Sequence, residues 1–219
     1  TVNYNNNSGK NYTVQIGPFS GNYYIPQGTN AKGFSSLANA FANINDVGLS
    51  GTVYLYIDDN LSETGANVLL NRSDLSATNN LIIKPSPAKT PTITFSGCTA
   101  TAGATQYTGL SLNGTSYVTV DGSNSENGTT KDLTLKMNDG TNGRNLIQLF
   151  GNCDNIAIKN LVIAFQSPMN TSNTTRGIYL NGQSTGASDN FIVQNCKIGD
   201  ATLTPYYGVG ITGGSGSSI

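Results

Sequence analysis

The chain has 219 residues and a formal net charge of −1, with 11 basic residues, 12 acidic residues and no histidine. Asparagine and glycine, with 29 and 26 copies, carry much of its polarity, a composition that favours turns and short strands. The small, scattered charge argues against nucleic acid binding, the lack of histidine excludes histidine-dependent zinc sites and catalytic triads, and no apolar run is long enough to span a membrane.

One amphipathic helix is predicted near the start of the chain, over residues 34–45. Apolar residues recur there at three- and four-residue intervals, at Phe34, Leu37, Ala38, Phe41 and Ile44. Ser35 or Ser36 is placed to cap the first turn. The residues before the helix, 1–33, are rich in Asn, Gly and Tyr and contain one strand candidate, YTVQI (12–16).

From residue 46 onward the sequence predicts short strands and no second helix. Each candidate alternates apolar and polar residues, or is a short run of Val, Ile, Leu and Tyr between turn residues. The predicted strands are 52–57, 67–70, 81–85, 92–95, 110–112, 117–120, 133–137, 147–150, 156–165, 178–180, 191–194 and 209–212.

One strand phrase recurs at a fixed spacing in the second half of the chain. LIQLFG begins at residue 146, GIYLNG at 177 and GVGITG at 208, so consecutive copies lie 31 residues apart. A looser copy, GLSLNG, begins at residue 109, which is 37 residues before the first of these. The three copies align Ile147 with Ile178 and Val209, Leu149 with Leu180 and Ile211, and Gly151 with Gly182 and Gly213.

A second phrase follows in each repeat, as YVTVDG (117–122), NIAIKN (155–160) and NFIVQN (190–195). Asn160 and Asn195 take equivalent places at its end, and the length differences between repeats fall in the linkers. Each repeat therefore contains at least two strands in a fixed order. We expect the two asparagines to stack at a corner and to hydrogen-bond along the axis as a ladder, with two independent surface turns as the alternative.

Repeats of this length with alternating apolar positions predict an all-β fold, a right-handed parallel β-helix or solenoid. Helical repeats would need a 3.6-residue period, and a propeller blade needs about 40–45 residues and four strands. The right-handed sense follows from the crossover preference of parallel strands. The helix would cover the open N-terminal end as an amphipathic cap. The chain then divides into an N-terminal strand and loop region (1–33), the capping helix (34–45) and the coils (46–219).

No second cap is predicted at the C-terminal end. The final residues, GVGITGGSGSSI, stop inside a repeat, so we expect the coils to continue beyond Ile219. A fibre in which the open end stacks on another copy of the chain is an alternative.

The acidic residues do not form the pattern of a carbohydrate-cleaving β-helix. Such an enzyme needs two carboxylates across a glycosidic bond, or an acidic calcium site beside a basic residue. Asp58 and Asp59 are adjacent and point to opposite faces of a strand end, and Asp121 begins an Asp-Gly turn. The outward positions collect no carboxylates, being Gln148, Tyr179 and Gly210 on one strand and Thr119, Ala157 and Ile192 on the other. We therefore predict no catalytic residue, cofactor or metal site.

Several basic and aromatic residues could instead contact an acidic glycan. Arg144 and Arg176 lie 32 residues apart, just before equivalent strands. The pairs Tyr23-Tyr24 and Tyr206-Tyr207 could stack on sugar rings, although Tyr is also a common strand residue. The candidate glycan contacts are Arg144, Arg176, Tyr179, Tyr206 and Tyr207. They leave a polysaccharide lyase, a glycosidase or a glycan-binding domain as the alternative function.

Three cysteines, Cys98, Cys153 and Cys196, occur without a CxxC motif, so at most one disulfide can form. We expect them to pack as small apolar groups. A bridge between Cys153 and Cys196 is the alternative, but their places in the repeat differ.

Four segments of the chain, in order, are GFSSLANAFANINDVGLSGTVYLYIDDNLSETG (33–65), ATNNLIIKPSP (77–87), SYVTVDGSNSENGTTKDLTL (116–135) and DNFIVQNCKI (189–198). Through these segments, roughly residues 30 to 200 resemble a family of very large secreted surface proteins of Bacteroidota, which are exported by the type IX secretion system and begin with right-handed β-helix modules. The family includes filamentous cell-surface adhesins, among them the mobile adhesins of gliding motility.

This resemblance implies a non-enzymatic, extracellular β-helix module of a large cell-surface adhesin or filament, serving attachment or gliding motility. Its partners would be surface glycans or other cell-surface proteins, together with the remainder of a longer chain. It carries over no catalytic residues to this module.

Overall fold

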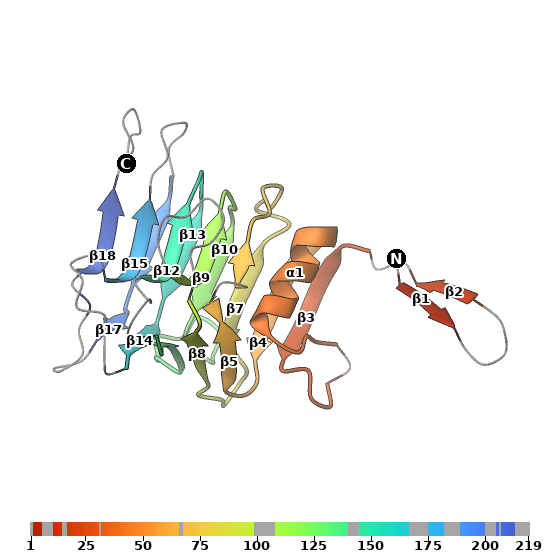
Figure 1. Cartoon of the computed structure of the whole chain (residues 1–219), viewed down its shortest axis with the longest axis horizontal. Coiled ribbons are helices and arrows are strands. Elements are labelled where there is room, and N and C mark those ends of the chain that lie inside the picture. Colours follow the sequence, from red (N-terminus) through yellow and green to blue (C-terminus); the bar gives the residue numbers. More distant parts are fainter. Residues whose placement is uncertain are drawn as a thin grey trace.

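Apart from a small N-terminal pair, the strands form three parallel sheets that extend along one common axis (Figure 1). In Figure 1 the early elements lie at the right and the late elements at the left. The arrangement is that of a computed structural model, which describes residues 2–5, 11–14, 17–30, 32–65, 68–98, 108–139, 145–166, 175–181, 189–199, 205 and 207–212.

From β4 onward, each sheet takes every third strand along the chain, and β3 is added to the first sheet. The first sheet contains β3 (Phe19–Ile25), β4 (Leu49–Ile57), β7 (Leu81–Pro85), β10 (Val118–Asp121), β13 (Ile156–Lys159) and β16 (Phe191–Gln194). The second contains β5 (Leu61–Thr64), β8 (Thr92–Ser96), β11 (Leu133–Met137), β14 (Leu161–Phe165) and β17 (Lys197–Ile198). The third contains β6 (Leu69–Leu70), β9 (Thr108–Asn113), β12 (Asn145–Phe150), β15 (Arg176–Asn181) and β18 (Tyr207–Thr212).

Each coil contributes one strand to every sheet, so the chain forms a parallel β-helix, as its repeats predict. Coils 1 to 5 are the strand triplets β4–β6, β7–β9, β10–β12, β13–β15 and β16–β18. The predicted strand 156–165 is two strands, β13 and β14, divided at Asn160, whose backbone φ is +58°. That left-handed conformation turns the chain from the first sheet into the second.

The pairing register confirms the apolar columns of the third sheet. Ile147 pairs with Ile178 and Ile178 with Val209, while Leu149 pairs with Leu180 and Leu180 with Ile211. The looser copy joins the same columns through Leu110 and Leu112, which pair with Ile147 and Leu149. These side chains are buried up to coil 4, and each contributes about 2 kcal/mol to the stability of the core. Gly182 and Gly213, at the end of the repeated phrase, lie outside the described residues.

The capping helix α1 spans Leu37–Val47, so it begins and ends slightly later than the predicted 34–45. The reason is the cap: Ser36 is the N-cap residue, and its hydroxyl accepts the backbone N–H of Asn39 at 3.0 Å. Phe34 therefore precedes the helix, where it is buried against the ring of Phe19. The buried face of the helix consists of Leu37, Ala40, Phe41 and Ile44. Within the described residues, no helix is long and apolar enough to cross a membrane.

The helix also closes the N-terminal edge of the third sheet. The side-chain amide of Asn45 donates to the carbonyl oxygen of Leu69 at 2.9 Å, and its oxygen accepts the N–H of Asn71 at 3.0 Å. Since β6 is the first strand of that sheet, these two bonds occupy backbone groups that would otherwise lack a strand neighbour.

The region before the helix contains more strand than the sequence indicates. β3 pairs with β4 and lengthens the first sheet by one strand, and the sequence does not predict it. Its register shifts between Phe19 and Gly21, which breaks the alternation that marks a strand. The predicted strand at 12–16 corresponds in part to β2 (Asn11–Val14), which pairs antiparallel with β1 (Val2–Asn5).

Candidate functional site

Three of the five candidate glycan contacts lie together on the outer face of the third sheet. Arg176 begins β15, Tyr179 follows on the same strand, and Tyr207 begins β18 in register with Arg176. The guanidinium carbon of Arg176 lies 4.1 Å from the ring centroid of Tyr179 and 5.7 Å from that of Tyr207. At these distances a guanidinium is attracted to an aromatic ring, so the three side chains form one cation–π stack.

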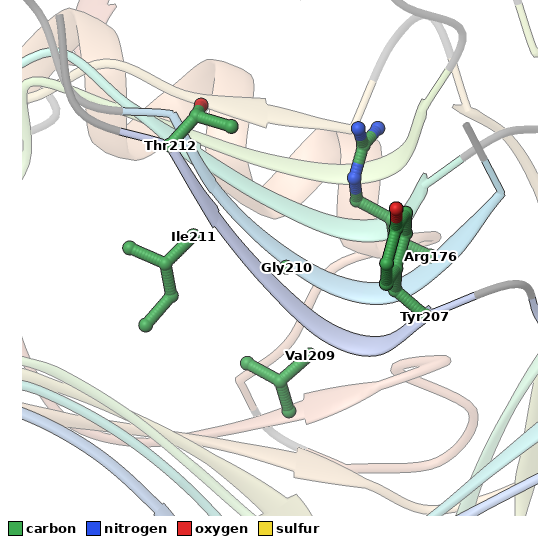
Figure 2. A pocket seen from close by; sticks show the side chains of 6 residues that line it. All are labelled: Arg176, Tyr207, Val209, Gly210, Ile211 and Thr212. Atoms are coloured by element: carbon green, nitrogen blue, oxygen red, sulfur yellow. The ribbon is translucent and has the colours of Figure 1, made fainter. Parts of the chain in front are cut away.

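The stack is reached mainly from the side of Tyr207. Arg176 is 9% exposed and Tyr179 5%, whereas Tyr207 is 46% exposed. The hydroxyls of Tyr179 and Thr212 share a hydrogen bond at 2.8 Å. A hollow of about 350 Å³ opens beside Arg176 and Tyr207, whose side chains lie next to each other in Figure 2. The remaining residues that line this third-sheet hollow are Val209, Gly210, Ile211 and Thr212.

Two other candidate contacts, Arg144 and Tyr206, lie outside the described residues. The predicted outward column is correct in register, since Gln148 pairs with Tyr179 and Tyr179 with Gly210. Its exposure differs from the expectation, because Gln148 is completely buried. Every residue of β12 is buried, so in this coil a side chain that points away from the core does not reach solvent.

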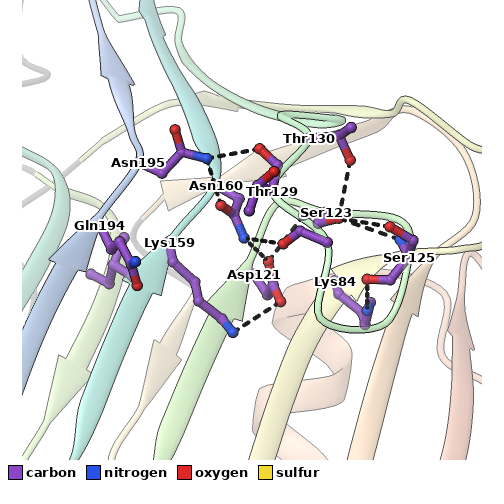
Figure 3. A network of polar contacts seen from close by, with 12 residues as sticks. Lys84, Asp121, Ser123, Ser125, Thr129, Thr130, Lys159, Asn160, Gln194 and Asn195 are labelled. Carbon is purple, nitrogen blue, oxygen red and sulfur yellow. Dashed lines mark hydrogen bonds and ion pairs between the residues drawn. The ribbon is translucent and has the colours of Figure 1, made fainter.

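A ladder of side-chain amides lies at the corner between the first and second sheets, where Asn160 and Asn195 were expected to stack. Asn195 Nδ2 donates to Asn160 Oδ1 at 2.8 Å, and Asn160 Nδ2 donates to Asp121 Oδ1 at 2.7 Å (Figure 3). Both asparagines have positive φ, at +58° and +52°, which Asn tolerates better than most residues. The corner thus links coils 3, 4 and 5 by side-chain hydrogen bonds.

The loop 122–132, which we call the corner loop, folds over this ladder. Its carbonyl groups at Gly128 and Thr129 accept hydrogen bonds from Asn160 and Asn195 at 3.2 and 2.7 Å. On its other side the carbonyl of Ser125 accepts a hydrogen bond from Lys84 Nζ at 3.1 Å. Figure 3 shows the loop between these two sets of contacts. Because Lys84 belongs to coil 2 and Asn195 to coil 5, one loop connects four successive coils.

Asp121 belongs to this network and has a structural role. Its carboxylate accepts the N–H of Ser123 at 3.0 Å as well as the amide of Asn160, and it pairs with Lys159 at 3.3 Å. It is 6% exposed. The sequence interpretation of a turn residue is correct, but it does not reveal that the carboxylate holds two coils together.

A second asparagine row, which the sequence analysis missed, lies at the start of the same strands. Asn190 Nδ2 donates to Asn155 Oδ1 at 3.2 Å, and both residues have φ of +56°. The matching residue of coil 3 is Tyr117, with φ of +55°. The sequence contained a signal for this row, because both NIAIKN and NFIVQN begin with Asn as well as end with it.

The acidic pair Asp58 and Asp59 lies in the turn after β4. Asp59 Oδ1 accepts the N–H of Asn60 at 2.7 Å, and Asn60 Oδ1 accepts the N–H of Thr92 in the next coil at 2.8 Å. A small hollow of about 240 Å³ lies here, lined by Asp58, Asp59, Asn60, Lys89, Thr90 and Pro91. Among the described residues, no group of three or more acidic, cysteine or histidine side chains could hold a metal ion.

None of the three cysteines is in a disulfide, so the alternative bridge between Cys153 and Cys196 is not formed. Comparisons with protein-family models, with curated proteins and with solved structures found no match to this chain. The function proposed below is therefore argued from the residues and geometry of the chain itself.

Proposed function

We propose that the chain is a non-enzymatic, extracellular β-helix module of a large cell-surface adhesin or filament, where it serves attachment or gliding motility. The observation that carries the proposal is the continuous connection between successive coils. Backbone ladders join the coils in all three sheets, and the corner loop joins coils 2 to 5 through side chains. A stack connected in this way resists extension along its axis, which is the property that a surface filament needs.

The roles of the acidic residues support the same proposal. The carboxylate of Asp121 is occupied by hydrogen bonds and by Lys159, and Asp59 is hydrogen-bonded within its turn. A catalytic carboxylate must instead reach the bond that it cleaves. The low content of charged residues and the high content of Asn, Thr and Gly are typical of long-lived extracellular repeats.

A test in the source bacterium follows from this proposal. Antibodies raised against the purified chain should label intact cells without permeabilisation. An in-frame deletion of the coils should reduce surface attachment or gliding, whereas Asp58→Ala in the full-length protein should change neither. Labelling only after permeabilisation, or a deletion strain that attaches and glides like its parent, would refute the proposal.

The third-sheet hollow supports a second candidate function, the binding of acidic glycans. Arg176 supplies a positive charge at its wall, and Tyr207 supplies an exposed aromatic ring. The purified chain should be screened against plant, algal and host glycans, with separate readings of binding and of newly formed reducing or unsaturated chain ends. Binding without cleavage supports a glycan-binding domain, and cleavage supports a lyase or glycosidase. If the chain neither binds nor cleaves any glycan, only the structural module remains as its function.

A further inference from the structure

The outer face of the first sheet begins with a platform of three tyrosines, which we call the tyrosine platform. Tyr54 and Tyr56 lie on β4 on either side of the buried Leu55, and Tyr24 of β3 pairs with Tyr56. The ring centroids of Tyr24 and Tyr56 are 5.5 Å apart, and those of Tyr54 and Tyr56 are 5.8 Å apart. The rings are nearly parallel, at 23° and 12°. All three side chains are half-buried, so part of each ring faces solvent.

A stripe that is apolar except for Thr119 continues from the tyrosine platform along the solenoid axis. Register places Tyr54, Ile82, Thr119, Ala157 and Ile192 in one outward column, one residue in each coil. Every member is partly or fully exposed, and Ile192 is 51% exposed. The side chains of the stripe lie outside the core, because the buried side chains of the same strands point to the opposite face of the sheet. A largely apolar stripe maintained through five coils on a solvent face is typical of a binding surface.

The row of residues beside the stripe is polar, but its charges are largely satisfied within the chain. Lys84 is buried under the corner loop and donates to Ser125, and Asp121 pairs with Lys159. Glu126, on the exposed part of that loop, lies close enough to Tyr56 to affect its ionisation. This local charge balance disfavours an anionic ligand and favours an uncharged one.

The tyrosine hydroxyls are suited to a hydroxyl-rich ligand. In the described part of the chain, no hydrogen bond is formed by the hydroxyls of Tyr24, Tyr54 or Tyr56. Burial, together with the neighbouring Tyr54, Tyr24 and Glu126, raises the pKa of Tyr56. Its phenol therefore stays protonated and can donate a hydrogen bond at physiological pH.

The spacing of the coils fits a polymer that lies along the axis. Neighbouring strands of a sheet are about 4.8 Å apart, which is close to the length that one pyranose ring occupies in an extended polysaccharide. The flat C–H faces of such rings pack on aromatic and aliphatic side chains, and their hydroxyls point sideways to polar neighbours. Each sugar ring would therefore lie over one coil. Its face would pack on the stripe residue of that coil, and its hydroxyls would point to the polar row beside the stripe.

We propose that the outer face of the first sheet binds a neutral polysaccharide, with sugar rings stacked on Tyr24, Tyr54 and Tyr56 and the following rings along the stripe from Ile82 to Ile192. This site is separate from the third-sheet hollow, which lies on another sheet and offers a cation. The polysaccharide would be the attachment ligand of the adhesin, so this inference rests on the proposed function. Binding by the purified chain is nevertheless measured independently of that function.

The experiment is a binding titration of the full chain with uncharged hexasaccharides of glucose, mannose and xylose, and with an acidic uronate hexasaccharide for comparison. At least one neutral hexasaccharide should bind, and the acidic one should bind more weakly. The double variant Tyr54→Ala with Tyr56→Ala should lose about tenfold or more in affinity. Tyr54→Phe with Tyr56→Phe should lose less, because it keeps the stacking rings and removes only the hydroxyl hydrogen bonds. Val162→Ala, at an outward apolar position of β14 in the second sheet, is the matched control and should bind like the parent chain.

Ile192→Asp provides a second variant at the far end of the stripe. The position is 51% exposed, so the introduced charge stays in solvent and the coil keeps its fold. It should weaken binding of the hexasaccharide more than binding of the corresponding disaccharide, which is too short to reach from the platform to coil 5. The proposal fails if no neutral hexasaccharide binds, if the alanine pair binds as well as the parent, or if Val162→Ala removes the binding. If the purified chain binds a hexasaccharide but antibodies do not label intact cells, the surface location is refuted and the binding site is not.

Discussion

The buried carboxylate of Glu63 accepts the backbone N–H of Leu37, the first residue of α1, at 2.6 Å. Its second oxygen accepts the N–H of Ala38 at 3.3 Å. In later coils the column that begins with Glu63 contains Phe95, Met137 and Phe165. An acid therefore stands in coil 1 where coils 2 to 4 have an apolar residue, because here the neighbour along the axis is a helix N-terminus with unsatisfied donors.

The other end of the helix is held in a complementary way. Arg72, in the turn after β6, donates from Nη1 to the carbonyl oxygen of Asn45 at 2.9 Å and also pairs with Asp74. The helix itself has no acid in its first turn and no base in its last turn. The first coil thus supplies both charges that favour a helix at these ends.

Removing the Glu63 carboxylate should destabilise the cap. Glu63→Ala leaves the N–H groups of Leu37 and Ala38 without their acceptor and opens a cavity, so we expect a loss of about 2–4 kcal/mol in the free energy of unfolding. Glu63→Gln keeps the size and one acceptor oxygen and should cost less, about 1 kcal/mol. Urea unfolding followed by circular dichroism measures both variants.

The matched control is Glu126→Gln, at an exposed position in the corner loop, which should change stability by less than about 0.5 kcal/mol. Stability of Glu63→Ala equal to that of the parent chain would show that the carboxylate does not anchor the helix.

The same carboxyl group predicts a dependence of stability on pH. Burial raises the pKa of Glu63 above 4.5, and the N–H donors of Leu37 and Ala38 oppose this only in part. The folded chain then binds the proton more tightly than the unfolded chain. The stabilisation that comes from protonated Glu63 is therefore complete below the pKa that Glu63 has in the unfolded chain. It is lost as the pH rises through the pKa of Glu63 in the folded chain.

We therefore expect the parent chain to gain stability relative to Glu63→Gln when the pH is lowered from about 7 to about 4. Denaturant unfolding of both proteins across this pH range measures the difference in their free energies of unfolding. The effects of all other titrating groups cancel in this difference, because both proteins contain them. A difference that grows toward neutral pH would mean that the helix N–H groups, rather than burial, dominate the ionisation of Glu63.

The asparagine ladder should contribute more than an ordinary surface turn. Asn160→Ala removes the bonds to Asp121, Gly128 and Asn195 and places a Cβ-bearing residue without a polar side chain at positive φ, so we expect a loss of about 3 kcal/mol. Asn160→Gly avoids the backbone strain and should lose about 1 kcal/mol less.

Asn190→Ala is the control for the ladder, since Asn190 has the same backbone conformation but an exposed side chain. It shares the strain of positive φ and lacks the buried hydrogen bonds, so it should cost about 1 kcal/mol. Losses of the same size at Asn160 and Asn190 would show that the ladder adds nothing beyond turn geometry. Thermal or urea unfolding of the three variants decides the matter.

The sequence predicts this fold well wherever a repeat is present. Columns such as Leu149, Leu180 and Ile211 follow from spacing alone, because a register in which inward residues stack buries all of them together. β5 and β3 were missed for local reasons. Glu63 takes an inward place in β5, which disguises the apolar alternation, and the register shift at Gly21 does the same in β3.

The candidate sites were predicted less well because outward positions obey weaker rules. Repeat spacing aligned Gln148 with Tyr179 and Asn160 with Asn195, but it gave no information on burial. Gln148 was expected on a solvent face and is completely buried. What packs on an outer face depends on the linkers, and their lengths differ from coil to coil. The tyrosine platform was missed because Tyr24 and Tyr56 become neighbours only through the pairing of β3, which the sequence does not predict.

The cysteines should differ in reactivity in the folded chain. Burial raises the pKa of Cys98 to about 12 and also raises that of Cys153, and both side chains are buried. Cys196 is half-buried, so it is the thiol that a reagent reaches most easily. Because the thiolate is the reacting species, native alkylation at mildly alkaline pH should modify Cys196 first and the other two only on unfolding. Peptide mass spectrometry measures the order, and rapid modification of Cys98 in the native chain would contradict the burial of that thiol.

A charge placed in an inward column should unfold the chain locally. Leu180 is 3% exposed and packs between Leu149 and Ile211 of the neighbouring coils. Leu180→Asp buries a carboxylate without a partner, at a cost of about 4 kcal/mol or more. In a solenoid each coil is stabilised mainly by its nearest neighbours, so the damage should be confined to coils 4 and 5.

Hydrogen exchange with mass spectrometry measures this directly. In Leu180→Asp, protection should be lost in β15 to β18 and retained in β4 and β7, whereas Gln194→Asp, at an exposed position of β16, should exchange like the parent chain. Loss of protection throughout all five coils would show that the solenoid unfolds as one cooperative unit. In that case the connection of coils 2 to 5 by the corner loop is strong enough to spread unfolding beyond the neighbouring coils. Because Asn160→Ala weakens this connection, combining it with Leu180→Asp should restore protection of the early coils.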